Sequence, residues 1–569
     1  MTEERRPLLQ ATRGYDGVKD DESDSSTQQN GPLDISAAMR RRILAGIWLA
    51  QFLSALNLTL VPTMLPSISS EFQKSNQASW IGTAYLLATC TFTPLYGRLS
   101  DVLGRRGASL SAASFASIGI LSCGLSRSME SLIASRFFSG LGGGGIFTTA
   151  AIITSDMYGM RSRGFIQSLG GIFYGLGMGL GGPFGGLMTD HFGWRSAFFI
   201  QLPFFGLALA LIFTNLRYTT PGSGRNTTDI LKRIDYGGSI TLLGMVGSVL
   251  AFLSARYHDG QEWCEPIVWI PCTLACVFGL LFLCVEFFVA VEPILPPLLI
   301  TEKVPVLVGC SNALVAICNL SVTYYFPVWF QTVMLSSAST AGLHLLPNSV
   351  CISTGSVFAG WVIRRTGRYK TMNMIFGCLP FLAALMLTRL REDSGPILKW
   401  FCIMPLGFGN AIVLQTMYIA LVSNLPESQL AVGTGFAQLL RGLGQVGGLA
   451  LASAVFQSRL DSELRHRIHG PQADELVHAI RHSVSLLQTL PPDLQRIARD
   501  SYAASLRSVF ILAACASLLA YIARVPIPDK QLEDHQPSRT PPPELEEDEV
   551  DQNTVRRDQD EAKSVLSRG

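Results

Sequence analysis

The chain has 569 residues, of which 48% are hydrophobic and only 15% are charged. Soluble domains carry about 25% charged residues, so this composition excludes an ordinary soluble protein and is typical of a membrane protein. The formal net charge of +2 is nearly balanced, and the positions of the charges are more informative than their sum.

Apolar runs follow one another along the chain, and each approaches the length of about 20 residues that a membrane span needs. In chain order the fourteen runs are Ile43–Leu65, Trp80–Tyr96, Ala108–Ser126, Leu132–Ile153, Phe165–Met188, Ala197–Leu216, Tyr236–Leu253, Ile267–Val289, Val304–Phe330, Gly342–Val362, Met372–Leu387, Leu398–Val422, Val432–Phe456 and Ala503–Ile522. The runs are solid rather than alternating, which predicts helices and not a β-barrel. We therefore expect an all-α polytopic membrane protein with 14 spans.

The short loops predict how the chain is oriented in the membrane. Basic residues gather before the first run and after runs 2, 4, 6 and 10, as in Arg40–Arg42, Arg105–Arg106 and Arg364–Arg365. The opposite loops carry single charges, with Arg389 and Arg391 as an exception. Because cytosolic loops are enriched in Lys and Arg, both termini are expected in the cytosol.

Three short patterns recur in the same order in two parts of the chain. "GRLSDVLGR" from Gly97 keeps its glycine and arginine spacing in "GWVIRRTGR" from Gly360. The other two pairs are "GLGGG" from Gly140 with "GFGNA" from Gly407, and "GFIQ" from Gly164 with "GFAQ" from Gly435. The offsets of 263, 267 and 271 residues predict two six-helix halves that repeat in parallel, with runs 7 and 8 inserted between them. A substrate path is expected where the halves meet.

This repeat and the composition of the ends predict the domain organisation. The predicted parts are a disordered cytosolic tail (1–38), the first six-helix half (39–234), two inserted helices (235–302), the second six-helix half (303–526) with a long non-cytosolic loop (457–502), and a disordered acidic tail (527–569). The mixture of charged and apolar residues in 457–502 favours short amphipathic helices lying over the exit.

The motifs resemble those of the major facilitator superfamily. "GRLSDVLGRR" is similar to the signature loop between its second and third helices, and "RFFSGLGGGG" from Arg136 to its fourth-helix motif. "GLGMGLGGPFGG" from Gly175 resembles the fifth-helix motif of its antiporters, and the two inserted helices match its fourteen-span drug:proton antiporters. "NLTLVPTMLPSI" and "SDMYGMRSRG" look most like the fungal vacuolar basic amino acid permeases.

The resemblance implies that the signature loop is a conformational latch between the halves. Its residues and their counterparts in the second half are Gly97, Asp101, Gly104, Arg105, Arg106, Gly360, Gly367 and Arg368. Glycine allows two helix ends to approach and turn sharply, and Asp101 can pair with an arginine. Since Arg364 takes the place of Asp101 in the second copy, Asp101 is predicted to be specific to one conformation. A loop that is only solvated is the alternative.

Arg136 lies inside the fourth run, where an ionisable residue is expensive and indicates function. Snorkelling toward the membrane surface is the alternative. The resemblance implies a role in proton coupling or substrate contact, shared with Asn57, Thr59 and Asp156. Related proton-coupled proteins carry an aspartate where Asn57 stands, and an amide cannot titrate.

The fifth run contains the small residues of the antiporter motif, of which Gly177, Gly182, Pro183 and Gly186 are the main candidates. Small residues let helices approach closely in lipid, and proline adds a kink. The resemblance implies that this helix seals the path in one state.

"EERRPLL" contains Glu4, Leu8 and Leu9 in the spacing of an acidic dileucine sorting signal. Such a signal predicts a sorting adaptor as partner and the vacuolar membrane as destination, although short motifs also arise by chance.

We therefore expect no enzyme but a secondary transporter that moves amino acids, basic ones in particular, across the vacuolar membrane by proton antiport with alternating access. Its partners would be a small-molecule substrate, protons and the lipid bilayer, with no cofactor, metal or nucleic acid. A plasma-membrane exporter of drugs or toxins and a non-transporting nutrient sensor are the alternatives. No metal-spaced His/Glu cluster or nucleophile–base set supports an enzyme.

Overall fold

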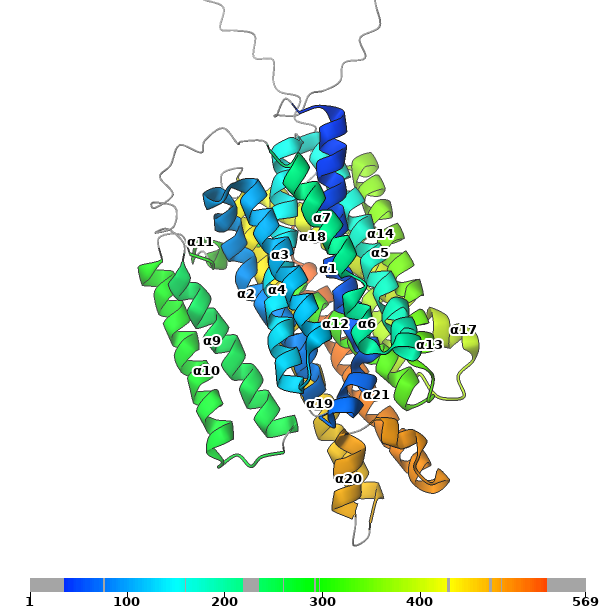
Figure 1. The fold of residues 1–569 in the computed structure, drawn as a ribbon. Helices are drawn as coiled ribbons and strands as arrows, with labels where there is room; N and C mark the ends of the chain where they lie inside the picture. Colours follow the sequence, from blue (N-terminus) through cyan, green and yellow to red (C-terminus); the bar gives the residue numbers. More distant parts are fainter. Residues whose placement is uncertain are drawn as a thin grey trace, which may run out of the picture.

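The computed structural model describes residues 35–529, except for 75–76, 159, 218–234, 259, 291–292, 296, 427–429, 470–472 and 483. The described part of the chain is helical throughout and contains no strand (Figure 1). The sorting motif at Glu4, Leu8 and Leu9 lies outside the described residues.

The described helices follow the order expected from the apolar runs. The first half contains α1 (Ala37–Phe72), α2 (Ala78–Val102), α3 (Gly104–Leu125), α4 (Met129–Met157), α5 (Met160–Phe192), α6 (Trp194–Phe199) and α7 (Leu202–Asn215). The inserted pair is α9 (Tyr236–Leu253), continued by η2 (Ser254–His258), and α10 (Pro266–Cys284), continued by η3 (Val285–Val289). The second half contains α11 (Pro297–Thr301), α12 (Lys303–Thr332), α13 (Ala338–Leu343), α14 (Leu346–Thr366), α15 (Lys370–Phe376), α16 (Leu379–Thr388), α17 (Pro396–Phe401), α18 (Met404–Asn424), α19 (Leu430–Arg467), α20 (Ala473–His482), η5 (Ser485–Gln488) and α21 (Pro492–Arg524).

Twelve helical segments within the described residues are long and apolar enough to cross a membrane. The helices α2 and α5, with 25 and 33 residues, do not belong to these twelve, although both pack inside the bundle. The all-α membrane fold is therefore confirmed, whereas the number of 14 spans stays a prediction.

Proline divides several spans into two helices. In α7, α14, α16 and α18 a proline occupies the second helical position, as Pro203 does in α7 and Pro405 in α18. Proline has no N–H to donate to the preceding turn, so it is tolerated at a helix start and interrupts the helix that precedes it. Each break lets a span change direction while its backbone stays hydrogen-bonded.

The two halves form one bundle, and the inserted pair lies at its edge. Figure 1 shows α9 and α10 side by side, apart from the densest part of the bundle. The helix α9 contacts α2 of the first half and α19 of the second, whereas α10 packs mainly on α9. The second inserted helix is therefore peripheral to the bundle.

Both ends of the described chain lie at the same end of the bundle, which we call the Gly104 end. Arg40 near the start lies over the Tyr158 ring, 5.8 Å from its centroid. Near the other terminus, the Tyr369 hydroxyl donates to the carbonyl of Pro528 (2.7 Å). The opposite end of the bundle carries α20 and is called the α20 end (Figure 1).

The predicted loop at 457–502 is shorter in the structure. The helix α19 continues to Arg467 and α21 begins at Pro492, so only 468–491 separates these long helices. Ion pairs one turn apart, such as Arg465–Asp461 (3.0 Å) and Arg467–Glu463 (2.9 Å), support the polar extension of α19. The ordered helical part also reaches slightly into both predicted tails (1–38 and 527–569), because α1 begins at Ala37 and Ile527 is buried.

Candidate functional site

The side chain of Arg136 is buried in the first half and only 1% exposed. Its Nε donates to the carbonyl of Ile81 (3.3 Å) and its Nη2 to the carbonyl of Asn57 (3.3 Å). The guanidinium lies 4.5 Å from the centroid of the Tyr85 ring. Arg136 thus lies between α1, α2 and α4 and does not snorkel to the membrane surface.

The glycines that follow Arg136 explain how the helices come so close. A Cβ on Gly140 would lie 2.2 Å from the carbonyl oxygen of Tyr85, and one on Gly142 would lie 2.2 Å from the backbone nitrogen of Ala116. Real side chains cannot occupy such positions, so α4 touches α2 and α3 backbone to backbone. This close packing brings the guanidinium to the carbonyl groups of α1 and α2.

No acidic side chain pairs with Arg136 among the described residues, where its Nη1 has no hydrogen-bond partner. Burying a charge is costly unless it is paired and hydrogen-bonded. Carbonyl dipoles and the Tyr85 ring offset part of that cost. The site therefore offers an unsatisfied cationic donor to an anionic group.

Asn57 lies beside Arg136 and is also 1% exposed. Its Nδ2 donates to the carbonyl of Leu53 (2.9 Å) and to Oε1 of Gln201 (2.7 Å), whereas its Oδ1 has no partner. Sequence reasoning missed Gln201. Its amide near the start of the apolar run Ala197–Leu216 was the available signal.

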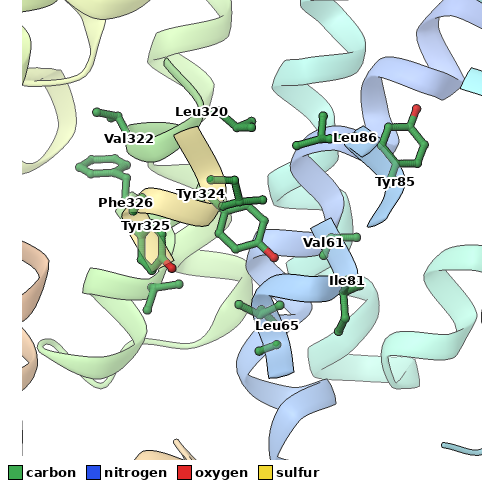
Figure 2. Close-up of a cluster of buried hydrophobic side chains, with 14 of the residues drawn as sticks. Val61, Leu65, Ile81, Tyr85, Leu86, Leu320, Val322, Tyr324, Tyr325 and Phe326 are labelled. Atoms are coloured by element: carbon green, nitrogen blue, oxygen red, sulfur yellow. The ribbon is translucent and has the colours of Figure 1, made fainter. Parts of the chain in front are cut away.

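Tyr324 of α12 lies at this site from the second half. We call the place where Arg136, Asn57 and Tyr324 come together the junction. A Cβ on Gly82 would lie 3.1 Å from its Oη, and Gly82 is adjacent to Ile81, which binds Arg136. The Tyr324 hydroxyl is buried without a hydrogen-bond partner in the described structure. Figure 2 shows the ring extended from α12 toward Val61 and Leu65 of α1. The structure thus brings three unpartnered polar atoms to the junction: Nη1 of Arg136, Oδ1 of Asn57 and Oη of Tyr324.

Two residues predicted to share this site lie elsewhere. The Thr59 hydroxyl donates to the carbonyl of Met178 (2.8 Å) and so joins α1 to α5. Asp156 is at the Gly104 end, where its Oδ2 accepts from Nε of Arg105 (2.8 Å). Asp156 is near the end of α4 opposite to Arg136, so any role of Asp156 in proton coupling or substrate contact would be exercised at the Gly104 end and stays a prediction.

The signature loop forms an ion-pair cluster within the first half. Nη1 of Arg105 donates to Asp101 (2.7 Å) and to the hydroxyl of Ser100 (2.9 Å), in addition to the pair with Asp156. Arg106 lies 4.3 Å from the centroid of the Phe213 ring. The cluster ties α2, α3 and α4 together at the Gly104 end.

Gly104 and Gly367, which the sequence repeat pairs, both have a positive φ angle. Their φ angles are +72° and +64°, in the left-handed region that glycine tolerates best. The exposed Arg368 follows Gly367, as Arg105 follows Gly104, and Gly360 lies within α14. Gly97 was expected to let two helix ends approach closely, but a Cβ there would meet no atom within 4 Å.

The glycines of α5 lie on two sides of the helix. On one side a Cβ on Gly177 would be 2.4 Å from the carbonyl oxygen of Phe52 in α1. On the other side a Cβ on Gly186 would be 2.3 Å from the carbonyl oxygen of Ala338 in α13, and Gly182 lies against Gly342. The helix α5 therefore joins the halves toward the α20 end.

The helices α2 and α19 touch in the middle and diverge toward the Gly104 end. A Cβ on Gly442 would lie 2.8 Å from Sγ of Cys90. Gly97 and Gly435 are seven residues further along the same faces, and a Cβ on either would meet nothing within 4 Å. The halves are thus in contact near the α20 end and are separated at this pair near the Gly104 end.

The family model of the Major Facilitator Superfamily matches residues 47–449. The chain belongs to this superfamily. Its members are transporters and not enzymes, and the arrangement of two helical halves around a junction fits that family. A bacterial homologue of the human lysosomal transporter Spinster has a solved structure with a TM-score of 0.56 at 14% identity, over 86% of this chain and 97% of that chain.

Curated relatives include transporters with two different descriptions. The chain is 34% identical to the multidrug resistance protein fnx1 of Schizosaccharomyces pombe, over 84% of this chain and 91% of the relative. It is 30% identical to the vacuolar membrane amino acid uptake transporter fnx2 of the same yeast, over 88% of this chain and 86% of the relative.

Proposed function

We propose that this superfamily member carries amino acids, basic ones in particular, across the vacuolar membrane in exchange for protons. The observation that carries the proposal is the pair of unpartnered atoms at the junction: a donor on Arg136 and an acceptor on Asn57. An amino acid has the matching groups, a carboxylate and an ammonium, one bond from the same carbon atom.

The carboxylate is assigned to Arg136, because a guanidinium binds carboxylates with charge-assisted hydrogen bonds. The ammonium group is assigned to Oδ1 of Asn57. The two residues are already neighbours, since Nη2 of Arg136 donates to the Asn57 carbonyl (3.3 Å). Tyr324 covers the site from the second half, so the substrate enters when α12 moves away from α2.

The preference for basic amino acids rests on the sequence resemblance to the fungal vacuolar permeases. A cationic side chain would then contact aromatic rings such as those of Tyr324 and Tyr85, because cations are attracted to ring faces. The name of the relative fnx2 agrees with amino acid transport across a vacuolar membrane.

By the positive-inside rule the Gly104 end would face the cytosol, and in a vacuolar membrane the α20 end would then face the lumen. In that orientation the structure is closed toward the lumen through α5 and α13. The divergence of α2 from α19 then faces the cytosol, from which the substrate would be loaded. Proton exchange would follow the gradient of an acidic vacuole.

Uptake of labelled arginine, lysine and histidine by vesicles that contain the purified chain tests the proposal. We expect uptake that requires an acidic interior and stops when the proton gradient is collapsed. Arg136→Gln should abolish uptake of every amino acid that the unaltered protein carries. Gradient-independent uptake would refute the exchange, and absence of amino acid uptake would refute the substrate class.

Arg524 offers a matched control for loss of a buried guanidinium. It is 1% exposed and bound by the carbonyls of Ala520 (3.0 Å) and Gly377 (3.0 Å), within the second half. Arg524→Gln also removes a buried charge, so it measures the effect on folding alone. If Arg136→Gln and Arg524→Gln reduce uptake and folded protein equally, Arg136 is structural.

A plasma-membrane exporter of drugs is the second candidate, supported by the description of the relative fnx1. Localisation separates the two functions. A fluorescent fusion should mark the vacuolar membrane, and Leu8→Ala with Leu9→Ala should redirect it if the dileucine motif recruits a sorting adaptor. A fusion at the cell surface would favour the exporter.

A further inference from the structure

A cavity of about 490 Å³ opens on the side of the bundle, and its lining residue Gln201 also accepts from Nδ2 of Asn57 (2.7 Å). Its floor is formed by Leu53 and Leu56 of α1, which are 2% and 5% exposed. Its rim includes Leu180 of α5, Phe204 of α7 and Leu343 of α13, each about 40–50% exposed. The volume lies within the range of about 300–1,000 Å³ that is typical of small-molecule sites.

The cavity has almost nothing to offer a polar ligand. Gln201 and Ser339 contribute its only polar side chains. The amide of Gln201 donates to Ala197 (2.6 Å) and accepts from Asn57 (2.7 Å), and the Ser339 hydroxyl bonds that of Ser337 (3.0 Å). The hydrogen-bonding groups are therefore already engaged, which favours a hydrocarbon ligand.

The opening of the cavity faces the membrane. Phe204 and Leu343 belong to helical segments that are long and apolar enough to span a bilayer, and all three exposed rim side chains are apolar. An apolar space does not retain water, and an empty one forfeits packing energy. The hydrocarbon that is present at this place is the acyl chain of a bilayer lipid.

We propose that one acyl chain of a membrane lipid, from the leaflet on the α20 side, occupies this cavity and stabilises the state in which the α20 end is closed. The cavity has walls from both halves, since Pro183 of α5 and Leu343 of α13 line it. These walls meet where Gly182 lies against Gly342.

Opening of the α20 end would separate α5 from α13 and so divide the cavity between the two halves. A ligand that binds only one of two states shifts the population toward that state. The acyl chain is thus a ligand of the closed state, and the lipid becomes a regulator of transport. The proposal depends on the fold and not on which solute is carried.

The test uses the full chain in vesicles of phosphatidylcholine that contain a fraction of the same lipid with a diazirine on its acyl chain. After irradiation, cross-linked peptides are identified by mass spectrometry. We expect labelling of α5, α7 and α13 around the cavity to exceed several-fold the labelling of α10, whose apolar side chains are equally exposed to lipid. Equal labelling of both regions would mean bulk lipid contact and would overturn the proposal.

Variants that fill the cavity provide the second arm. Leu180→Trp and Phe204→Trp add volume from two walls at partly exposed positions, and each should lower the cavity labelling several-fold. Leu280→Trp on α10, where the side chain is 66% exposed, is the matched control and should leave that labelling unchanged. Labelling that persists in both filled variants would refute the proposal that an acyl chain occupies this cavity.

A maleimide probe at Ser349→Cys of α14, whose side chain is 6% exposed and lies against Gly179 of α5, reports separation of the halves at this interface. Exchange of the lipid for a detergent without long acyl chains should increase its reaction rate several-fold, and restored lipid should reverse the change. An unchanged rate would refute the link to conformation. Displacement of the cross-linking lipid by the transported solute would instead assign the cavity to the solute.

Discussion

Gly186 of α5 and Ala338 of α13 touch backbone to backbone across the two halves. A Cβ on Gly186 would lie 2.3 Å from the carbonyl oxygen of Ala338 and 2.5 Å from its carbonyl carbon. Because backbone atoms cannot move aside as a flexible side chain does, only glycine permits this contact. The closure of the α20 end depends on this contact and on the neighbouring one between Gly182 and Gly342.

Gly186→Ala should therefore shift the protein away from the closed α20 end and reduce transport at least tenfold. The control is Gly171→Ala in the same helix, where a Cβ would meet no atom within 4 Å. Alanine favours a helix over glycine by about 1 kcal/mol, so the control should be neutral or stabilising. Transport rates, together with cysteine labelling at the α20 end, would check both outcomes; equal behaviour of the two variants would contradict the sealing role.

Gly104→Ala and Gly367→Ala should each lower the free energy of unfolding by about 1–2 kcal/mol, because both glycines adopt left-handed φ angles. Gly97→Ala should leave this state unaffected, since the added Cβ has open space. Thermal unfolding of the purified variants measures the difference. If Gly97→Ala spares stability but impairs transport, Gly97 packs closely in another state of the cycle.

The sequence patterns predicted the order of the helices and the glycine turns at Gly104 and Gly367, whereas the repeated halves stay a prediction. These features depend on local signals: apolar runs, loop charges and glycines at fixed spacing. The extension of α19 beyond Phe456 was missed because its support comes from ion pairs on a polar helix surface rather than from hydrophobicity.

The composition of the candidate site was harder to predict than the fold. Arg136 was recognised from its place in an apolar run and Asn57 from the family resemblance, but their contact with each other depends on how α1 and α4 pack. Gln201 meets Asn57 across 144 residues of sequence, and Tyr324 comes from the other half. Such tertiary contacts leave no periodic signal in one sequence.

Asn57→Asp should make stability depend on pH. Nδ2 of Asn57 donates to the carbonyl of Leu53 and to Oε1 of Gln201, and an ionised carboxylate can donate to neither. A protonated carboxyl can donate to one of them, so the folded state should favour protonation and bind more protons than the unfolded state. The stability of the variant relative to the unaltered protein should rise as the pH falls from about 8 to about 5.

Thermal unfolding over that pH range checks this outcome, with Asn57→Ser as a control that cannot titrate. A stability that instead falls with acidification would show that the new carboxylate is stabilised by Arg136. In the Asn57→Asp variant the Arg136 guanidinium would then bind the new carboxylate at position 57 instead of the backbone carbonyl of that residue.

Asp156→Asn should destabilise the present state more than Asp101→Asn does. Both carboxylates bind Arg105, but the Asp156 side chain is 17% exposed and the Asp101 side chain 46%. Exposed pairs contribute about 0–1 kcal/mol, and less exposed pairs are harder to replace. Unfolding by heat compares the two variants; a larger loss for Asp101→Asn would contradict the order.

Asp101→Asn should instead act on the opposite state, in which the Gly104 end is closed. Within the described part of the chain Asp101 binds Arg105 of the first half, so its role as a latch between the halves remains a hypothesis. Cysteine labelling at both ends of the bundle during transport would test it. Unchanged labelling and unchanged transport would refute the hypothesis.

The inserted helices offer an exposed position at which movement of the two halves relative to each other can be followed. Nε1 of Trp80 in α2 donates to the hydroxyl of Ser254 (2.9 Å), close to the end where the halves are in contact. The turn between α9 and α10 is exposed at Trp263 and is held by Arg256, which lies 5.2 Å from that ring's centroid. A spin label or antibody epitope built into this turn, with a second label on α14, would show whether the inserted pair moves with α2 or with α19, since it contacts both.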